Sequence, residues 1–250
     1  MARSFRTQVE MIAGHARAAP DRVAMRQKEH GIWQELTWSA LEEVTRALAA
    51  GLIELGMDHG AHCGILSENR RDWVLAQFAV ATAGGVVVGM YPTSPAAEIE
   101  HLVNASDTEI LFVEDQEQLD KILELRGRLP RLRRVIVFDP RGTGGVTDYG
   151  LLSFEALIAR GSAAAEAQAA EIARRQGRIA AHDTAMMVFT SGSTGLPKAA
   201  MISHANLSAA ADYAREIFGG FPPGTNILSY LPLCHIAEQN VTVTNALAGQ

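Results

Sequence analysis

Residues 185–198 read AMMVFTSGSTGLPK. The apolar run Met186–Phe189 predicts a buried strand, which leads directly into Thr190–Gly195, a segment with four hydroxyl side chains and two glycines. Glycine lets the backbone turn tightly, so that successive N–H groups point into one concavity. The hydroxyls add hydrogen-bond donors and Lys198 adds a positive charge, which together suit the many acceptor oxygens of a polyphosphate. The stretch therefore predicts a strand followed by a phosphate-binding loop.

Two other interpretations of this loop are weaker. A run of Ser, Gly and Thr is often only a flexible connection, but such a connection rarely lies between a buried strand and a Pro-Lys turn. The Walker A loop, GxxxxGK[ST], requires Lys directly after the second glycine. Here Leu196 follows Gly195, and no Ser or Thr follows Lys198. The glycine spacing of kinase and Rossmann loops also fails. The loop is therefore a phosphate loop of another type.

Strand-like and helix-like segments alternate before this loop. The spacing of Leu41, Val44, Leu48 and Leu52 predicts a helix that begins with a capping box at Ser39 and Glu42 and stops at Gly56. The remaining predicted elements are strands at 63–66, 86–88, 110–113 and 135–138 and helices at 71–83, from Pro95, and at 117–126. This alternation implies an α/β fold with a mainly parallel sheet covered by helices.

Three segments complete the organisation of the chain. Residues 141–150 are glycine-rich but lack GxGxxG spacing, so no ligand is assigned to them. Residues 163–175 are rich in Ala, Glu, Gln and Arg, which fits either an exposed helix or a linker. We place a boundary near residue 180, with residues 1–180 as a first α/β subdomain and residues 181–250 as the start of a second.

A second informative stretch, residues 228–239, reads LSYLPLCHIAEQ. It predicts a strand that ends at Pro232 and presents His235 at the start of an apolar helix. From the residues alone, His235 is either a helix cap or a buried histidine. The other histidines lack a partner pattern, and His204 is expected to order the turn after the loop.

Composition excludes several classes of protein. The net charge of −6 gives no basic face for nucleic acid, and the run of arginines at 126–134 is expected to be a solvated helix end. Cys63 and Cys234 lack CxxC spacing, which predicts reduced thiols in a cytoplasmic protein without a zinc site. The N-terminus has no signal-peptide pattern and no apolar window reaches about 18 residues, although a peripheral membrane contact stays open.

Thr190–Lys198, TSGSTGLPK, closely resembles the phosphate-loop signature of the adenylate-forming superfamily. That superfamily often continues with Gly-Val, where this chain has Ala199-Ala200. Weaker similarities follow in the same order over 36–41, 65–70 and 85–92, so the resemblance covers nearly all of residues 30–250. It implies the N-terminal part of the large domain of the adenylate-forming fold, with layered parallel-rich sheets flanked by helices. Residues 228–239 resemble the long-chain fatty acyl-CoA synthetase branch.

The resemblance implies two half-reactions. A fatty carboxylate attacks the α-phosphate of ATP, which releases pyrophosphate and leaves acyl-AMP, and the thiol of CoA then attacks the acyl carbon and expels AMP. Lys198 would screen phosphate charge, Thr190 would contact Mg²⁺, and His235 would lie beside the acyl pocket. The implied nucleotide-binding residues are Thr190, Ser191, Gly192, Ser193, Thr194, Gly195 and Lys198.

Three further elements of the superfamily do not occur in residues 1–250. They are a Tyr-Gly-x-Thr-Glu segment, a ribose-binding aspartate and a lysine on a mobile C-terminal domain. We therefore expect an incomplete, inactive portion of a ligase, with no complete catalytic set. The alternatives are a ligase for a medium-chain, aryl or steroid acid, or a non-catalytic shortened relative that acts as a binding module. Acyl length, acceptor thiol and oligomeric state are not fixed by the residues.

Overall fold

The computed structural model of the chain describes residues 5–190, 195–218 and 224–248. The strands are β1 (Val23–Glu29), β2 (Ile32–Thr37), β3 (His62–Leu66), β4 (Val86–Met90), β5 (Ile110–Val113), β6 (Arg134–Val137), β7 (Leu152–Ser153), β8 (Thr184–Thr190) and β9 (Lys198–Ser203). The helices are α1 (Gln8–Ala18), α2 (Trp38–Glu54), α3 (Arg71–Thr82), α4 (Ala96–Ala105), α5 (Gln116–Glu124), the 3₁₀ helix η1 (Asp148–Gly150), α6 (Phe154–Arg178), α7 (His204–Phe218), α8 (Ile236–Glu238), the π-helix η2 (Gln239–Thr244) and α9 (Asn245–Ala248).

Seven of these strands form one sheet in the order β7-β6-β5-β3-β4-β8-β9. Every neighbouring pair from β7 to β8 is parallel, and only β9 runs antiparallel to its neighbour β8. The carboxyl ends of the parallel strands consequently lie at one edge of the sheet, where ligands of open α/β sheets are bound. This architecture confirms the predicted α/β class with a mainly parallel sheet.

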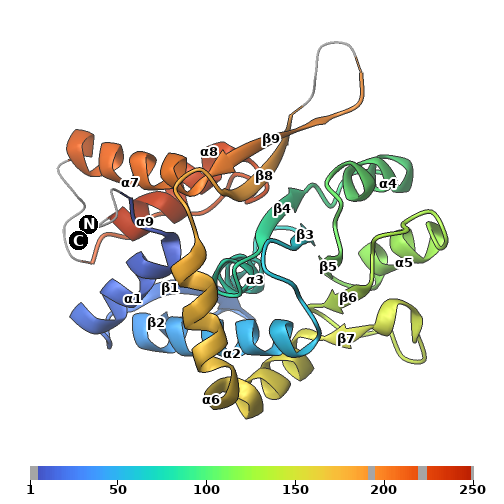
Figure 1. Cartoon of the computed structure of the whole chain (residues 1–250), viewed down its shortest axis with the longest axis horizontal. Coiled ribbons are helices and arrows are strands. Elements are labelled where there is room, and N and C mark those ends of the chain that lie inside the picture. Colours follow the sequence, from blue (N-terminus) through green and yellow to red (C-terminus); the bar gives the residue numbers. More distant parts are fainter. Residues whose placement is uncertain (1–4, 191–194, 219–223, 249–250) are drawn as a thin grey trace.

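Helices cover both faces of this sheet. Figure 1 shows α4 and α5 on one side and α2, α3 and α6 on the other. Alternate residues of each strand therefore enter two separate apolar clusters. Ile65, Val87 and Phe112 pack under α2 and α3, whereas Leu66, Val88 and Val113 pack under α4 and α5. Burial on both faces explains why these strands read as continuous apolar runs and not as alternating ones.

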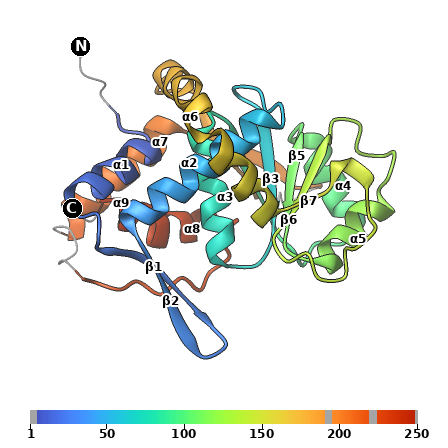
Figure 2. The same ribbon diagram turned by 90° about the horizontal axis from the view of Figure 1, so that it is seen from below.

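Helices α2 and α6 approach each other unusually closely. A Cβ atom added to Gly161 of α6 would lie 1.7 Å from the carbonyl oxygen of Ala47 in α2, and one added to Gly51 would lie 2.8 Å from the carbonyl oxygen of Leu157. Figure 2 shows the two helices crossing beside α3. The two backbones can touch only because both positions lack a side chain.

Some predicted boundaries are wrong. Helix α2 begins at Trp38 and is capped by Thr37, whose side chain accepts from Ala40 N at 3.3 Å, whereas Ser39 lies inside the first turn and donates to Pro20 O at 3.0 Å. The helix starts two residues earlier than predicted because Thr37 offers the same capping hydroxyl. The predicted stop at Gly56 is confirmed, since Gly56 has φ +84° directly after the helix.

Residues 163–175, which the sequence left between helix and linker, belong to the 25-residue helix α6. The segment is not exposed on all sides. Arg175 is buried, and its Nη1 donates to Met57 O at 2.9 Å and Ala83 O at 3.1 Å, while its Nε lies 2.6 Å from Glu171 Oε1. This guanidinium closes the C-terminal end of α3 against α6.

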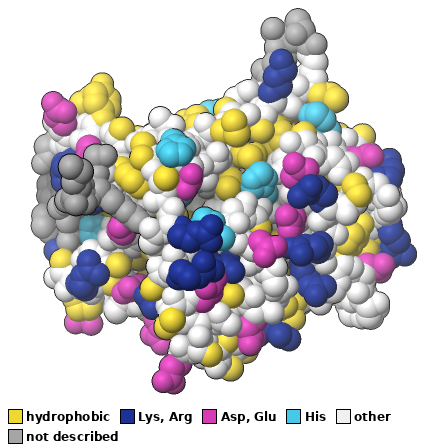
Figure 3. Space-filling view, in the orientation of Figure 1, with side chains coloured by type: hydrophobic (Ala, Val, Ile, Leu, Met, Phe, Trp, Pro, Cys, Tyr) yellow, Lys and Arg dark blue, Asp and Glu magenta, His cyan; other side chains and the backbone are white. Residues whose placement is uncertain are grey.

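The arginines at 126–134 lie beyond the end of α5, in a loop and the start of β6, and not at a helix end as predicted. Most of them have carboxylate partners: Arg126 pairs with Asp148, Arg128 with Glu100, and Arg131 and Arg133 with Glu109. On the right of Figure 3, where α5 and β6 lie, lysine and arginine side chains are interleaved with aspartate and glutamate. These charges therefore form ion pairs and not a basic surface.

The sheet continues across the proposed boundary near residue 180, since Val88 of β4 pairs with Met187 of β8. The division into two subdomains stays a prediction. Within the described residues, no helix is both long and apolar enough to cross a bilayer.

Candidate nucleotide and acyl site

The predicted phosphate loop connects β8 to β9. Thr190 and Lys198 are direct partners across this antiparallel pair, and Thr190 Oγ1 donates to Lys198 O at 3.4 Å. Both residues are exposed, as is Gly195. The predicted residues Ser191, Gly192, Ser193 and Thr194 lie outside the described residues. The hairpin thus holds the two ends of the loop together at the carboxyl end of β8.

Lys198 has no carboxylate partner among the residues that the structure describes. Its ammonium group stands on the exposed strand β9, and the hydroxyl of Thr190 lies directly opposite its backbone. A cation without an internal counter-ion beside a hydroxyl- and glycine-rich turn can receive an anionic ligand.

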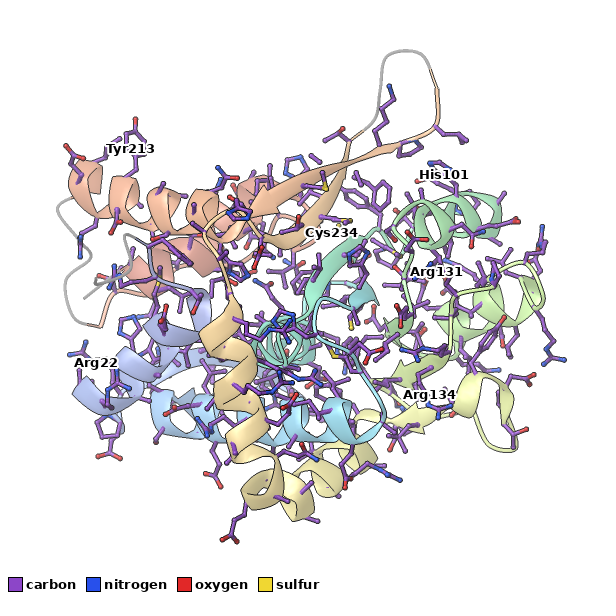
Figure 4. The ribbon with its side chains drawn as sticks, in the orientation of Figure 1. Arg22, His101, Arg131, Arg134, Tyr213 and Cys234 are labelled. Atoms are coloured by element: carbon purple, nitrogen blue, oxygen red, sulfur yellow. The ribbon has the colours of Figure 1, made fainter. Side chains whose placement is uncertain are left out.

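A histidine on α4 contacts the end of the loop. His101 Nε2 donates to Pro197 O at 2.8 Å, and Figure 4 shows His101 beneath the outer part of the β9 hairpin. The contact joins α4 to the residue before Lys198. The sequence gives no partner pattern for His101, because no local pattern links residues 96 positions apart.

The stretch that contains His235 lies against the carboxyl ends of β3 and β4. Asn69, three residues after β3, binds this stretch with both ends of its amide. Its Nδ2 donates to Leu231 O at 2.6 Å and to Ser229 Oγ at 3.2 Å, and its Oδ1 accepts from Leu233 N at 2.8 Å. The Asn69 side chain therefore contacts residues 229, 231 and 233 of this path.

Gly89 in β4 allows this stretch to approach the sheet. A Cβ atom at Gly89 would lie 2.8 Å from Cys234 Cα. Burial raises the pKa of the Cys234 thiol to about 12. The pKa of the Tyr91 phenol is also raised, first by burial and second by the neighbouring Cys234. The thiol is therefore protonated near neutral pH and packs as an apolar group; Figure 4 shows it beside the sheet.

His235 caps α8, since its Nδ1 accepts from Ala237 N at 3.0 Å. The imidazole is exposed, and Nε2 is left to interact outside the chain. The predicted strand before Pro232 is wrong. Residues 225–230 form no ladder with a described strand, and the expected apolar helix is the three-residue α8 followed by the π-helix η2. The stretch is held by side chains instead of a strand partner.

A buried polar cluster behind His235 was not predicted. Gln239 is fully buried; its Nε2 donates to Leu233 O at 2.7 Å and its amide pairs with Gln77 of α3 at 2.9 Å. Glu238, also fully buried, accepts from Leu231 N at 3.2 Å and Thr242 Oγ1 at 2.5 Å. Buried polar groups with several partners fix one backbone arrangement, because leaving any partner unsatisfied is costly.

Those predicted site residues that the structure describes lie at neighbouring strand ends. Cys234 packs on Gly89, which pairs with Val188, two residues before Thr190. The loop and His235 are one strand apart at the same edge of the sheet, although no contact joins His235 to Thr190 or Lys198. His204 is buried and begins α7, where its backbone N–H donates to Asp183 O at 3.1 Å; the expected role of its side chain in ordering this turn stays a prediction.

A mainly parallel α/β sheet with a loop connecting β8 to β9 at its carboxyl edge is the architecture of α/β proteins that bind ligands at this edge. The family model described as AMP-binding enzyme matches residues 12–250. The chain therefore belongs to the AMP-binding enzyme family, as the resemblance of TSGSTGLPK indicated.

Several curated relatives match most of the chain. It is 33% identical over 212 residues to the long-chain-fatty-acid–CoA ligase heimdall of Drosophila melanogaster, which covers 83% of this chain and 30% of that protein. It is 30% identical over 234 residues to the long-chain-fatty-acid–CoA ligase FadD15 of Mycobacterium tuberculosis, which covers 93% of this chain and 37% of that protein. The chain thus spans about a third of the length of these relatives.

Solved structures share the fold. Acetoacetyl-CoA synthetase from Streptomyces lividans superposes with a TM-score of 0.78 at 24% identity, over 98% of this chain and 37% of that one. A long-chain-fatty-acid-CoA ligase (FadD1) from Archaeoglobus fulgidus gives a TM-score of 0.77 at 22% identity, over 98% and 46% of the two chains. At these identities, the two superpositions show that the fold is shared.

Proposed function

We propose that this chain is part of an ATP-dependent ligase that activates a fatty carboxylic acid to acyl-AMP and transfers the acyl group to CoA. The carrying observation is the β8–β9 hairpin, which pairs Thr190 with Lys198 at the carboxyl edge of the sheet. Membership of the AMP-binding family and the names of the relatives, long-chain-fatty-acid–CoA ligases, support the proposal.

In this proposal the loop binds and aligns polyphosphate. Backbone N–H groups of residues 192–195, with the hydroxyls of Ser191, Ser193 and Thr194, would hold the β- and γ-phosphates, and Lys198 would screen their charge. Phosphoryl and nucleotidyl transfer depend on such alignment and charge neutralisation more than on covalent help. The ammonium of Lys198, which has no carboxylate partner within the part of the chain that the structure describes, fits this task, and His101 contacts the end of the loop.

Mg²⁺ would bind mainly to the phosphates of ATP, with Thr190 as a protein contact. Among the described residues, no group of three or more His, Cys, Asp or Glu side chains could hold a metal ion. The phosphate oxygens and the Thr190 hydroxyl suit Mg²⁺, which usually keeps several waters and substrate oxygens as ligands. CoA would supply the thiol for the second half-reaction.

His235 would lie on the acyl side of the site. Its Nδ1 is held by Ala237 N and its Nε2 is accessible, so the ring can donate one hydrogen bond outward. The side chain resonances of His235 should therefore shift when decanoate is added to the chain. His182, whose side chain is 90% exposed, is the control and should not shift. Equal shifts of both histidines would remove the acyl-side role.

The first test of the proposal is a set of calorimetric titrations with ATP, pyrophosphate and AMP. The loop contacts are to polyphosphate, so pyrophosphate should compete with ATP, whereas AMP should bind much more weakly. Pure chain should not form AMP from ATP and palmitate, because the ribose and C-terminal elements of the superfamily do not occur in residues 1–250. Measurable AMP formation would refute that part, and absence of ATP binding would favour a non-catalytic binding module.

A further inference from the structure

The hairpin β1–β2 is a two-stranded sheet separate from the main sheet. Its turn, His30-Gly31, has φ values of 48° and 84°, and the next two residues are large and apolar. Ile32 is 65% exposed and Trp33 is 58% exposed. Figure 2 shows the hairpin projecting beyond the helices that surround its base. Because successive side chains of a strand point to opposite faces, Ile32 and Trp33 place one exposed apolar side chain on each face of the projecting tip.

Strand β1 of the hairpin is joined to the body of the protein through Arg71. Gln27 Oε1 accepts from Arg71 N at 2.5 Å, and Glu29 lies 3.6 Å from the Arg71 guanidinium. On the other strand, Glu35 pairs with Arg26 at 2.6 Å. The tip is therefore held in place, and both acidic side chains near it are neutralised.

One cation near the tip is not neutralised. Lys28 is exposed and has no carboxylate partner among the described residues. In the ladder it lies directly opposite Trp33, so the two side chains share one face of the hairpin.

We propose that the β1–β2 tip docks on the surface of a lipid bilayer that contains anionic lipids. Tryptophan prefers the interfacial layer, where its apolar ring is buried and its N–H stays near water. Ile32 enters the acyl boundary beside it, and Lys28 meets the lipid phosphates or carboxylates. This arrangement favours a bilayer over a protein partner, because the projecting tip exposes an apolar side chain on each face and carries beside Trp33 a lysine without a carboxylate partner among the described residues.

This inference goes beyond the proposed function and does not depend on it, since vesicle binding requires neither ATP nor the phosphate loop. If both hold, docking would bring the chain to membranes into which fatty acids partition. A failure to bind vesicles would leave ATP binding unaffected, and the reverse also applies, so the two proposals fail separately.

The intact chain offers a direct optical test. Of its three tryptophans, Trp38 and Trp73 are 6% and 0% exposed, so Trp33 is the one that solvent reaches. Adding mixed phosphatidylcholine and phosphatidylserine vesicles should shift its emission to shorter wavelength, and lipids brominated on the acyl chains should quench it. No shift and no quenching at lipid concentrations that pellet the protein would overturn the proposal.

Variants then locate the contact. In vesicle sedimentation, I32S/W33S should lower partitioning about tenfold or more, because both apolar groups are lost. K28A should weaken binding about fivefold on mixed vesicles but not on pure phosphatidylcholine. K198A and the double variant Y213S/I217S, which removes exposed apolar groups from α7, are the controls and should bind as the unchanged chain does.

Equal loss of binding in Y213S/I217S would overturn the assignment to the tip. A concentration-dependent dimer that I32S/W33S abolishes would assign the tip to a second copy of the chain instead. Thermal unfolding of each variant verifies folding, and the brominated-lipid measurement decides the question if I32S/W33S does not fold.

Discussion

Replacement of Gly161 by alanine should separate two central helices and destabilise the protein. The new Cβ would lie 1.7 Å from Ala47 O and 2.6 Å from Ala47 C, both backbone atoms that cannot rotate away. Helices α2 and α6 would have to move apart by about 1.5 Å to restore contact distance, which loosens buried side chains such as Leu48 and Leu157.

Two effects of opposite sign decide the size of the change. Overpacking of a well-filled interior costs about 1–3 kcal/mol and sometimes more. Alanine also favours a helix over glycine by about 1 kcal/mol. Because the clash is with backbone, the upper part of the first range applies, and the net loss should be about 2 kcal/mol. In urea this lowers the midpoint by about 0.5 M or more.

Gly177→Ala is the matched control in the same helix. Nothing lies within 4 Å of a Cβ atom at Gly177, so only the helix preference remains and stability should rise by up to about 1 kcal/mol. The assay is urea unfolding followed by circular dichroism. The reasoning is refuted if G161A is as stable as the unchanged chain, or if the two variants shift the midpoint in the same direction.

Three further outcomes are expected. Cys63 and Cys234, whose thiol pKa values burial raises, should react with iodoacetamide at pH 7.5 only after unfolding; rapid labelling of the native chain would contradict their placement. The two adjacent arginines lower the pKa of Glu171 from 4.5 to about 2, so its contribution to stability is present above pH 4.5 and is lost as pH falls toward 2. E171Q should therefore show a smaller decline of the unfolding midpoint over this window, and an unchanged pH profile would remove the effect. Asn69→Asp keeps the oxygen that accepts from Leu233 N but loses the N–H that donates to Leu231 O. Hydrogen exchange in residues 229–233 should therefore become faster in N69D, and less so in N69Q. Unchanged exchange in N69D would contradict the role of Asn69 in holding these residues.

Much of the sheet could be predicted because its strands are buried on both faces. Segments such as 110–113 are short continuous apolar runs, and the helices between them repeat at three and four residues, so the order of elements follows from pattern alone. The two-stranded β1–β2 hairpin was missed, because its residues are half exposed and mix charged with apolar side chains.

The site was predicted only in part for a different reason. The loop from Thr190 to Lys198 is contiguous, so its residue types and spacing are visible in the chain. The contacts of His101 with Pro197 and of Asn69 with residues 229–233 join positions 96 to 164 residues apart, which no local pattern encodes. The close approach at Gly89 likewise depends on a partner far along the chain.

The role of Lys198 in binding polyphosphate is tested by calorimetric titration of ATP into three proteins: the unchanged chain, K198A and K28A. A charge-assisted contact contributes about 1.5–3 kcal/mol, and exposure places Lys198 at the lower end. K198A should therefore weaken ATP binding about tenfold, whereas K28A, which removes an exposed lysine from the distant β1–β2 hairpin, should leave it unchanged. Equal ATP affinities for K198A and K28A would contradict the assignment of the β8–β9 loop as the nucleotide site.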